Sequence, residues 1–298
     1  RDPEMSRGLG DVYKRQMLRV GVIGCGGMGR DHIRRLTEKI QGAEVVAVSD
    51  VFEESAKKAA EICGAKVYTD SRELINAEDV DAVFIVSPGF AHVDSLLQAI
   101  EAGKRIFCEK PLCTTAEDCL KVVKAEEAAG KHLIQLGFMR RYDKGYQQIK
   151  EALATGEYGE PLILHCTHRN PEVGTNYNTP MAVHDTAIHE IDVLHWLVDD
   201  EYESAQVVMP RVTKYSHSEL KDPQIMMLRT KKGVCIDVEV FVNCKFGYDI
   251  NCEVVCEDGA LKMAQPAYPS IRKNAAVSTA IDTDSVSYTH LTLPTNSR

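Results

Sequence analysis

This 298-residue sequence lacks the features that mark membrane, nucleic-acid-binding and disulfide-rich proteins. No apolar run is long enough to span a bilayer, and a formal net charge of −9 argues against nucleic acid as a partner. The ten cysteines include no C-x-x-C pair, and several fall inside apolar strand-like runs. The segment MLRVGVIG, residues 17–24, is typical of a strand and not of an export signal. We therefore expect a cytoplasmic protein with reduced, mostly buried thiols.

Both ends of the chain suggest translated adaptor DNA. One possible coding of DVYKRQ, residues 11–16, is GAT GTG TAT AAG AGA CAG. Its reverse complement, read two bases in, encodes VSYTH and the first base of a leucine codon, which fits the VSYTHL of residues 286–291. The two flanks fit one inverted element that resembles the transposon end used in sequencing libraries. We therefore expect residues 1–16 and 285–298 to be adaptor, a natural start at Met17 and a truncated C-terminus.

A glycine-rich turn lies between the first predicted strand and the first predicted helix. Gly24, Gly26 and Gly29 form the pattern G-x-G-x-x-G directly after an apolar, β-branched run. The first glycine permits a tight turn, the second lets a pyrophosphate approach the backbone, and the third lets helix and strand pack closely. Because a helix N-terminus also attracts phosphates, this turn predicts a dinucleotide-binding domain.

An acidic residue ends the second predicted strand, EVVAVSD. Asp50 lies 21 residues after Gly29, where a carboxylate is expected to bind the ribose hydroxyls of adenosine. A carboxylate there repels a 2′-phosphate, and no arginine follows in DVFEES, so the pattern predicts NAD rather than NADP. An alternative is that Asp50 caps the next helix, with Glu53 completing a capping box.

Continuous apolar strands alternate with helices through the first half, which is the pattern of a doubly wound parallel sheet. We predict an α/β fold in which residues 17–138 form an N-terminal Rossmann domain. Ligands bind outside the carboxyl ends of such strands, where Ser87, Glu109 and Lys110 stand. Lys110 is a candidate active-site residue. The alternative interpretation is that Lys110 is a surface lysine at the start of a turn.

The second half, residues 139–284, reads as a C-terminal α+β domain that the expected truncation leaves incomplete. A helix is predicted at about 144–155, and the chain is strand-rich beyond Glu203. Gly233 and the pair Asp258-Gly259 mark hairpin turns. These patterns predict an open, largely antiparallel sheet with helices on one face. The other face is expected to alternate apolar residues too and to pack on another subunit.

Residues 184–196, HDTAIHEIDVLHW, place chemically active side chains at helical spacing. On an α-helix Asp185, His189 and Asp192 share one face, with the only tryptophan, Trp196, at its far end. The two histidines that begin this stretch are five residues apart rather than the four of a helical zinc pair, so no metal is predicted. A solvated or structural stripe stays open as an interpretation. The third interpretation is a general base, because an aspartate one turn before a histidine can orient its imidazole.

Several segments together resemble the glucose–fructose oxidoreductase/inositol dehydrogenase family over nearly all of residues 17–284. They are GVIGCGGMGRDH, CEKPL, GFMRRYD, HCTHRNP and DTAIHEIDVLHWL. The E-K-P and D-x-x-x-H-x-x-D elements are quite specific to that family, while R-R-Y-D and H-R-N-P point to its inositol branch. The family's usual T-P-N is Ser-Pro-Gly here, at residues 87–89.

The resemblance implies a set of site residues and an assembly. The implied catalytic residues are Lys110, Asp185 and His189. The implied cofactor contacts are Gly24, Gly26, Gly27, Met28, Gly29, Asp50, Ser87, His92, Glu109 and Lys110. The implied substrate contacts are Lys110, Met139, Arg140, His168, Asn170, Asp185, His189, Asp192 and Tyr248. Members of the family are usually tetramers assembled through the open sheet, so a homotetramer is expected.

The function that the resemblance implies is NAD-dependent oxidation of a neutral cyclic polyol, with myo-inositol as the first candidate. Lys110 is expected to polarise the reacting oxygen, and His189 is expected to take its proton. Dehydrogenation of scyllo-inositol or of a pyranose sugar is an alternative. A non-catalytic nucleotide sensor on the same fold is another, because a fold does not determine a function. The joint presence of Lys110, Asp185 and His189 argues against the sensor.

Overall fold

The computed structural model describes residues 17–263 of the chain. These residues divide between Gly137 and Phe138 into two units, each with a sheet and a hydrophobic core of its own. The domains predicted from the sequence, residues 17–138 and 139–284, place the junction one residue later and extend past the described part. Both segments interpreted as adaptor lie outside the described residues.

The first unit has a parallel sheet with the strand order β3-β2-β1-β4-β5-β6. Its strands are β1 (Leu18–Ile23), β2 (Ala43–Ser49), β3 (Lys66–Tyr68), β4 (Ala82–Ile85), β5 (Arg105–Cys108) and β6 (Ile134–Leu136). Its helices are α1 (Gly27–Glu38), α2 (Glu53–Cys63), α3 (Ser71–Ile75), the 3-10 helix η1 (Gly89–Ala91), α4 (His92–Glu101) and α5 (Ala116–Ala129). The predicted doubly wound sheet is confirmed, although the short elements β3 and α3 were not predicted.

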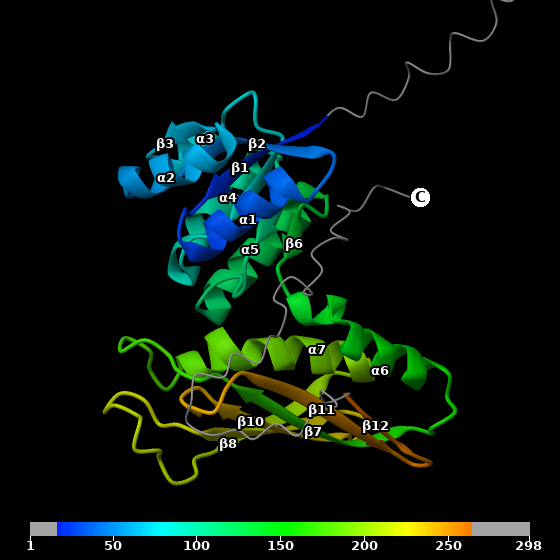
Figure 1. Cartoon of the computed structure of the whole chain (residues 1–298). Helices are drawn as coiled ribbons and strands as arrows, with labels where there is room; N and C mark the ends of the chain where they lie inside the picture. Colours follow the sequence, from blue (N-terminus) through cyan, green and yellow to red (C-terminus); the bar gives the residue numbers. More distant parts are fainter. Residues whose placement is uncertain (1–16, 264–298) are drawn as a thin grey trace, which may run out of the picture. The chain divides into compact units, whose positions relative to one another are not determined.

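Burial explains why the apolar runs of the first unit form its central strands. All four residues of β4 are buried, as are the last four of β1. A strand that has parallel neighbours on both sides and helices on both faces needs apolar side chains at every position. Helices α1 and α2 pack near β2, whereas α4 packs near β5 and α5 packs against α4 (Figure 1).

The strand order of this sheet reverses between β1 and β4. The chain runs from β1 to β2 and β3, and then crosses to β4 on the other side of β1. The carboxyl ends of these strands are tied together, because Val86 N donates to Ile23 O at 2.8 Å and Gly24 N donates to Ser49 O at 2.8 Å. In open α/β sheets, ligands bind outside the carboxyl ends at such a reversal.

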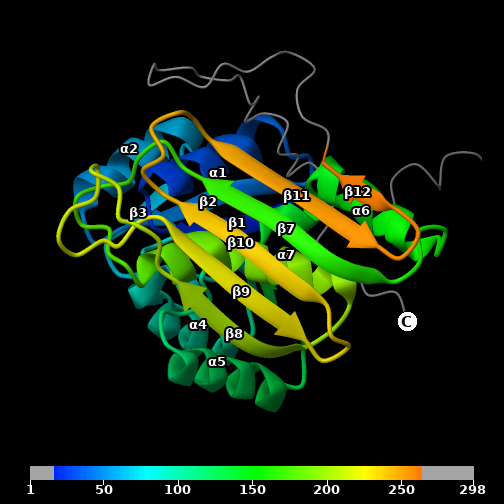
Figure 2. The same cartoon turned by 90° about the horizontal axis from the view of Figure 1, so that it is seen from below.

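The second unit has a mixed sheet with the strand order β12-β11-β7-β10-β9-β8 (Figure 2). Its strands are β7 (Pro161–Arg169), β8 (Tyr202–Val208), β9 (Gln224–Thr230), β10 (Cys235–Phe241), β11 (Asp249–Cys256) and β12 (Ala260–Lys262). Its helical segments are the 3-10 helix η2 (Met139–Tyr142), α6 (Lys144–Ala154), the π-helix η3 (Ala182–Ala187) and α7 (Ile188–Val198). Strands β7 and β10 pair in parallel and the other pairs are antiparallel, so the predicted open, largely antiparallel sheet is confirmed.

Helices α6 and α7 cover one face of this sheet (Figure 1). Strand β10 shows the alternation that this requires, because Ile236, Val238 and Val240 are buried while the residues between them are not. The predicted turns are also present. Gly233, with φ of 96°, lies in the hairpin between β9 and β10, and Gly259 accepts from Cys256 in the turn that leads to β12.

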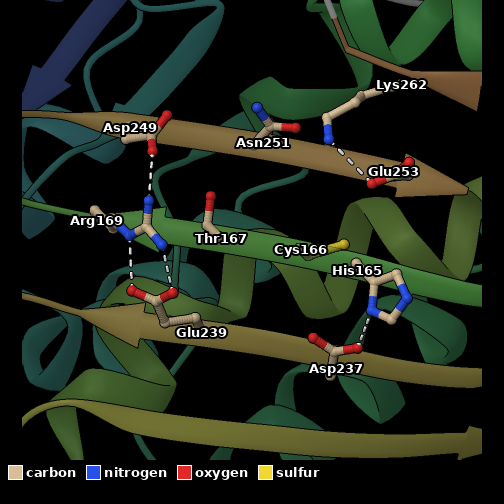
Figure 3. Close-up of a pocket in the computed structure, with 10 residues that line it drawn as sticks. All are labelled: His165, Cys166, Thr167, Arg169, Asp237, Glu239, Asp249, Asn251, Glu253 and Lys262. Atoms are coloured by element: carbon tan, nitrogen blue, oxygen red, sulfur yellow. Dashed lines mark hydrogen bonds and ion pairs between the residues drawn. The ribbon is translucent and has the colours of Figure 1, made fainter. Parts of the chain in front are cut away.

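The outer face of the sheet, turned away from α6 and α7, is charged at its centre. The sequence predicted that apolar residues alternate on this face too, whereas the structure has charged residues at its centre. Arg169 on β7 pairs with Glu239 on β10 at 2.5 Å and with Asp249 on β11 at 2.8 Å (Figure 3). The strands do alternate, but their apolar residues face the helices. Exposed apolar residues lie toward the ends and edge of this face, including Ile163 and Met227.

Candidate functional site

The glycine-rich turn of the first unit has the geometry that the motif requires. Gly24 has φ of 96°, and a Cβ there would lie 2.5 Å from the backbone nitrogen of Ser87. A Cβ on Gly29 would lie 1.9 Å from the carbonyl oxygen of Gly24, so helix α1 and the turn pack together only without that carbon. On Gly26 and Gly27 a Cβ would meet no described atom within 4 Å. This leaves room for a ligand to approach the backbone.

The N-terminus of α1 continues this cradle. Its N-cap is Gly26, no side chain of the described residues caps it, and its first turn holds no acidic residue. A helix N-terminus without acidic neighbours carries partial positive charge and free N–H groups, which favour a phosphate. The structure therefore fits the pyrophosphate of a dinucleotide at Gly26, Gly27 and Met28.

Asp50, directly after β2, fastens the end of that strand to the glycine-rich turn. Its carboxylate accepts from Cys25 N at 2.8 Å and from Phe52 N at 2.9 Å. The alternative that Asp50 caps α2 is wrong, because the N-cap of that helix is Phe52. The chain turns between β2 and α2, so Asp50 stands too far from the helix to cap it. Its predicted contact with ribose stays a prediction.

His92 connects the loops that follow β4 and β5. It is 1% exposed, with Nδ1 2.8 Å from the carbonyl oxygen of Pro111 and Nε2 2.7 Å from that of Ser87. Both ring nitrogens thus contact backbone. Contacts of the His92 ring therefore link the loop that contains Ser87 to the loop that contains Pro111.

Glu109 and Lys110 directly follow β5. The Glu109 carboxylate lies 2.8 Å from His32 Nε2 and accepts from Lys110 N at 3.2 Å. His32 is buried, and its ring packs edge-on against Phe84 and Phe107. The role of His32 was not predicted. A signal was present, because His32 falls on the buried face of α1.

Side chains from four segments of the second unit meet in a buried cluster. Arg140, in η2, donates through Nη2 to the Tyr248 hydroxyl at 2.6 Å, and its Nε lies 3.9 Å from Glu190 Oε1. His168, on β7, places Nδ1 2.6 Å from Glu190 Oε2. The ring centroid of His168 lies 6.1 Å from that of Tyr248 and 6.3 Å from that of His189. Four predicted substrate residues are thus brought together.

Burial and charge set the electrostatics of this cluster. Arg140 and His189 are each 7% exposed, His168 is 4% exposed and Glu190 is fully buried. Burial by itself lowers the pKa of Arg140, but the neighbouring Tyr248 oxygen and the Glu190 carboxylate raise that pKa above its ordinary value. The guanidinium therefore stays charged inside the unit.

The helical stripe predicted for residues 184–196 is interrupted. Asp185 lies in the π-helix η3, whereas His189 lies in α7. A π-helical turn is wider than an α-helical turn, so a rotation of 100° per residue does not hold between these two positions. The Asp185 carboxylate lies 2.6 Å from Nδ1 of its neighbour His184. The expectation of one continuous α-helix is therefore wrong.

Three further predicted substrate residues, Met139, Asn170 and Asp192, also lie in the second unit. Asp192 is held by a two-pronged contact with Arg141, at 2.8 Å and 2.5 Å, and this hydrogen bonding raises the pKa of Arg141. Met139 begins η2. Asn170 follows β7, with its backbone N–H donating to Phe241 at 2.9 Å. Arg141 was missed as the partner of Asp192.

Glu190 is the other residue that sequence reasoning missed. A signal for it was present, because it falls between the buried positions Ala187 and Val193 on the face of α7 that packs into the core. A charged residue on such a face is almost never fully buried without a partner.

A hollow of about 230 Å³ lies elsewhere, on the outer face of the second sheet over β7, β10 and β11 (Figure 3). Its charges largely compensate one another, as in the contacts of Arg169 with Glu239 at 2.5 Å and of Lys262 with Glu253 at 3.1 Å. His168 and Glu190 lie on the opposite face, so we give the buried cluster more weight than this hollow. Across residues 17–263, no group of three His, Cys, Asp or Glu residues is arranged to hold a metal ion.

Two models of protein families match the chain. A model described as "Oxidoreductase family, NAD-binding Rossmann fold" matches residues 18–138, and one described as "GFO/IDH/MocA C-terminal domain" matches residues 146–262. None of the helices between residues 17 and 263 is long and apolar enough to cross a membrane.

Curated relatives match both units. Inositol 2-dehydrogenase of Klebsiella pneumoniae subsp. pneumoniae is 53% identical over 269 residues, which are 90% of this chain and 80% of that protein. Inositol 2-dehydrogenase/D-chiro-inositol 3-dehydrogenase of Halalkalibacterium halodurans is 53% identical over 266 residues, which are 89% of this chain and 76% of that protein.

Solved structures of inositol dehydrogenases are also similar to this chain. The myo-inositol dehydrogenase of Lactobacillus casei, crystallised with NAD(H) and myo-inositol, aligns with a TM-score of 0.82 and 46% identity, covering 88% of this chain and 78% of the other. The scyllo-inositol dehydrogenase of the same organism, with NAD(H) and scyllo-inositol, aligns with a TM-score of 0.78 and 25% identity, covering 84% and 76%. The predictions of an oxidoreductase and of NAD as its cofactor are confirmed.

Proposed function

Since this chain belongs to the GFO/IDH/MocA oxidoreductase family, we propose that it is an inositol 2-dehydrogenase that oxidises myo-inositol to 2-keto-myo-inositol (scyllo-inosose). The observation that carries the proposal is the buried cluster of Arg140, His168, His189 and Tyr248. These side chains offer hydrogen-bond donors and acceptors, as a neutral polyol with a hydroxyl on every ring carbon requires. Identity of 53% to inositol 2-dehydrogenases supports the same substrate class.

The residues of the first unit hold the cofactor in this proposal. The turn from Gly24 to Gly29 receives the pyrophosphate at the N-terminus of α1, and Asp50 receives the ribose hydroxyls of the adenosine. Ser87, His92 and Glu109 belong to the loops that complete the nicotinamide side. When bound, NAD supplies an acceptor for the hydride at C4 of its nicotinamide ring.

Three residues carry the proton chemistry in this proposal. His189 takes the proton of the reacting hydroxyl as the C–H bond of the same carbon gives up its hydride, which leaves a ketone. Lys110 donates a hydrogen bond to the reacting oxygen and stabilises the negative charge that develops there. Asp185 stabilises the charged form of His189. The contacts of Met139, Asn170 and Asp192 with substrate hydroxyls belong to the same proposal.

Three alternatives remain testable. Oxidation of scyllo-inositol is less favoured, because identity to the scyllo-inositol enzyme is 25% against 46% to the myo-inositol enzyme. A pyranose sugar is a further candidate substrate. A non-catalytic nucleotide sensor is disfavoured, because the chain carries Lys110, Asp185 and His189 together.

The test is a panel of myo-inositol, scyllo-inositol, D-chiro-inositol and glucose, each assayed with NAD and with NADP by the absorbance of the reduced cofactor. We expect kcat/KM for myo-inositol with NAD to exceed the other substrates by about tenfold or more, because unpaired polar groups in a pocket discriminate strongly. The Lys110→Met variant, purified in the same way, controls for contaminating dehydrogenases. Binding of NAD without turnover of any polyol would favour the sensor.

We also propose a homotetramer in the cytoplasm, assembled through the outer face of the second sheet. Support comes from the exposed apolar residues Ile163 and Met227, which flank the charged centre of that face. Sedimentation velocity is expected to give the mass of four chains, and a monomer at all concentrations would exclude this assembly.

A further inference from the structure

The structure assigns Glu190 a role that the proposed function does not include. We propose that Glu190 is a positioning residue that holds His168 with its proton on Nδ1. The other ring nitrogen, Nε2, then accepts a hydrogen bond from a substrate hydroxyl. This inference rests on the proposed function, because it concerns how the buried cluster recognises a polyol.

Glu190 is a buried carboxylate, and its burial requires partners inside the unit. Its exposure is 0%, and it lies on α7 among core residues such as Val193 and Leu194. Burying a carboxylate is costly unless partners compensate its charge. An apolar side chain at this position would fill the core without that cost, so the partners of Glu190 must explain its presence.

The first partner is His168. Its Nδ1 lies 2.6 Å from Glu190 Oε2, within hydrogen-bond range. An ionised carboxylate only accepts hydrogen bonds, so Nδ1 must carry the proton and donate. In a neutral imidazole the proton on one nitrogen leaves a lone pair on the other, and the tautomer of a histidine is set by the bond that one nitrogen makes. Glu190 therefore makes Nε2 of His168 an acceptor.

The second partner, Arg140, balances the charge of Glu190. Its Nε lies 3.9 Å from Glu190 Oε1, and an arginine side chain stays protonated in proteins. One negative and one positive charge then balance in a cluster whose three members are at most 7% exposed. Glu190 therefore reaches Nδ1 of His168 with its charge compensated by Arg140.

The second nitrogen of His168 stands ready for a ligand. Among residues 17–263 it has no hydrogen-bond partner, while the rings of Tyr248 and His189 lie nearby at centroid distances of 6.1 Å and 6.3 Å. A hydroxyl can donate to it, whereas a keto or ether oxygen cannot. The cluster therefore selects a substrate that carries a free hydroxyl at this point.

The kinetic test replaces Glu190 with its neutral isostere. In Glu190→Gln we expect KM for myo-inositol to rise about tenfold and KM for NAD to change less than twofold, because one substrate hydrogen bond is weakened. Asp222→Asn is the matched control, since Asp222 is a buried carboxylate that accepts from Val242 N and Asn243 N outside the cluster. It should lower Tm and leave KM for myo-inositol unchanged.

A double-mutant cycle asks whether Glu190 acts through His168. Once His168→Ala has removed the imidazole, adding Glu190→Gln should raise KM less than a further twofold. An undiminished tenfold effect in the His168→Ala background would overturn the inference, as would an unchanged KM in a folded Glu190→Gln protein.

A spectroscopic test is independent of activity. Long-range ¹H–¹⁵N NMR of the histidine-labelled protein, with His168 assigned from its Ala variant, reports which ring nitrogen carries the proton. We expect Nδ1–H in the unmutated protein and a changed pattern in Glu190→Gln. A proton on Nε2 overturns the inference, even if Glu190→Gln does not fold. Failure to oxidise any polyol would instead defeat the proposed function, with the tautomer still measured.

Discussion

The candidate site of the first unit consists mainly of backbone groups, whereas that of the second unit consists of side chains. In the first unit the turn from Gly24 to Gly29 presents backbone, and its shape depends on the absence of side chains. In the second unit the cluster presents side chains from segments far apart in the chain, and the bond from Arg140 to Tyr248 spans 108 positions. A site made of backbone is therefore damaged by adding atoms, whereas a site made of side chains is damaged by removing a charge or a proton.

The largest expected effect comes from removing a side chain from the second unit. His189→Ala should lower kcat by about 10²–10⁴, which is the usual contribution of a positioned base. KM for NAD should change little, because the cradle for NAD lies in the first unit. The measurements are kcat and Tm on the same preparation. A folded His189→Ala enzyme with near-native kcat would show that His189 is only structural.

The same measurements on variants of Lys110 and Asp185 test the other two proposed catalytic residues. Lys110→Met should cost at least as much, because it removes charge where charge develops. Asp185→Asn should also reduce kcat, since it removes the charge that stabilises the imidazolium. The combined losses should be far from additive, because residues that share one step act as a unit. Additive losses would contradict a shared role.

The next largest effect adds an atom to the first unit. Gly29→Ala should destabilise the protein by about 1–3 kcal/mol, because its Cβ would lie 1.9 Å from the carbonyl oxygen of Gly24. Gly26→Ala is the matched control, since its Cβ would meet no described atom within 4 Å. We expect Gly26→Ala to keep Tm and raise KM for NAD. Equal Tm values for the two variants would contradict the packing argument.

A moderate effect is expected at Asp50, the one side chain on which the backbone-made site depends. Asp50→Ala removes the acceptor for Cys25 N and the predicted partner of the ribose hydroxyls. It should weaken NAD use and relax discrimination against NADP. The measurement is the ratio of kcat/KM for the two cofactors. An unmutated enzyme that prefers NADP would refute the interpretation of this strand end.

A smaller effect concerns acid stability of the first unit. The hydrogen bond from Arg19 lowers the pKa of Asp81 to about 2. Because the folded pKa is below the ordinary value of 3.8, this stabilisation is present above pH 4 and disappears as the pH falls toward 2. Asp81→Asn should lower Tm by about 1–3 °C at neutral pH, because an ion pair whose side chains are 33% and 37% exposed contributes little. The difference should vanish near pH 2, and a constant difference would contradict it.

The smallest effect is chemical. Burial, followed by the nearby Asp50 carboxylate, raises the pKa of Cys25 to about 12, so its thiol stays protonated. Cys235 on β10 is exposed. In dissociated chains a disulfide reagent should therefore modify Cys235 rapidly, whereas assembly through the outer face of the sheet should slow that reaction, and Cys25 should react only on unfolding. Cys235→Ser should remove the fast phase without changing kcat. Rapid labelling of Cys25 would show that the glycine-rich turn opens.

Local patterns allowed most of the first unit to be predicted. The G-x-G-x-x-G turn, the carboxylate at Asp50 and the alternation of strands and helices each depend on neighbours within a few turns of chain. The exceptions, β3 and α3, are three and five residues long. Elements of that length carry too few residues for a period to show.

In the second unit, local sequence patterns did not predict every feature of the fold. The strands, hairpins and covering helices were predicted. The outer face was expected to alternate apolar residues too, but its centre carries Arg169, Glu239 and Asp249. Alternation along a strand says that its two faces differ. It does not say which face meets the helices, because that depends on where the neighbouring strands and helices lie.

By itself, the sequence determined the class of fold, the position of the nucleotide cradle and the resemblance to a polyol dehydrogenase family. These follow from spacing, because glycines, strand ends and helix starts act within a short length of chain. Only the tertiary structure decided that Glu190 contacts His168 and Arg140, and that Asp185 lies in a π-helix that ends before His189. Such contacts depend on distances between segments remote in the chain, and packing sets those distances.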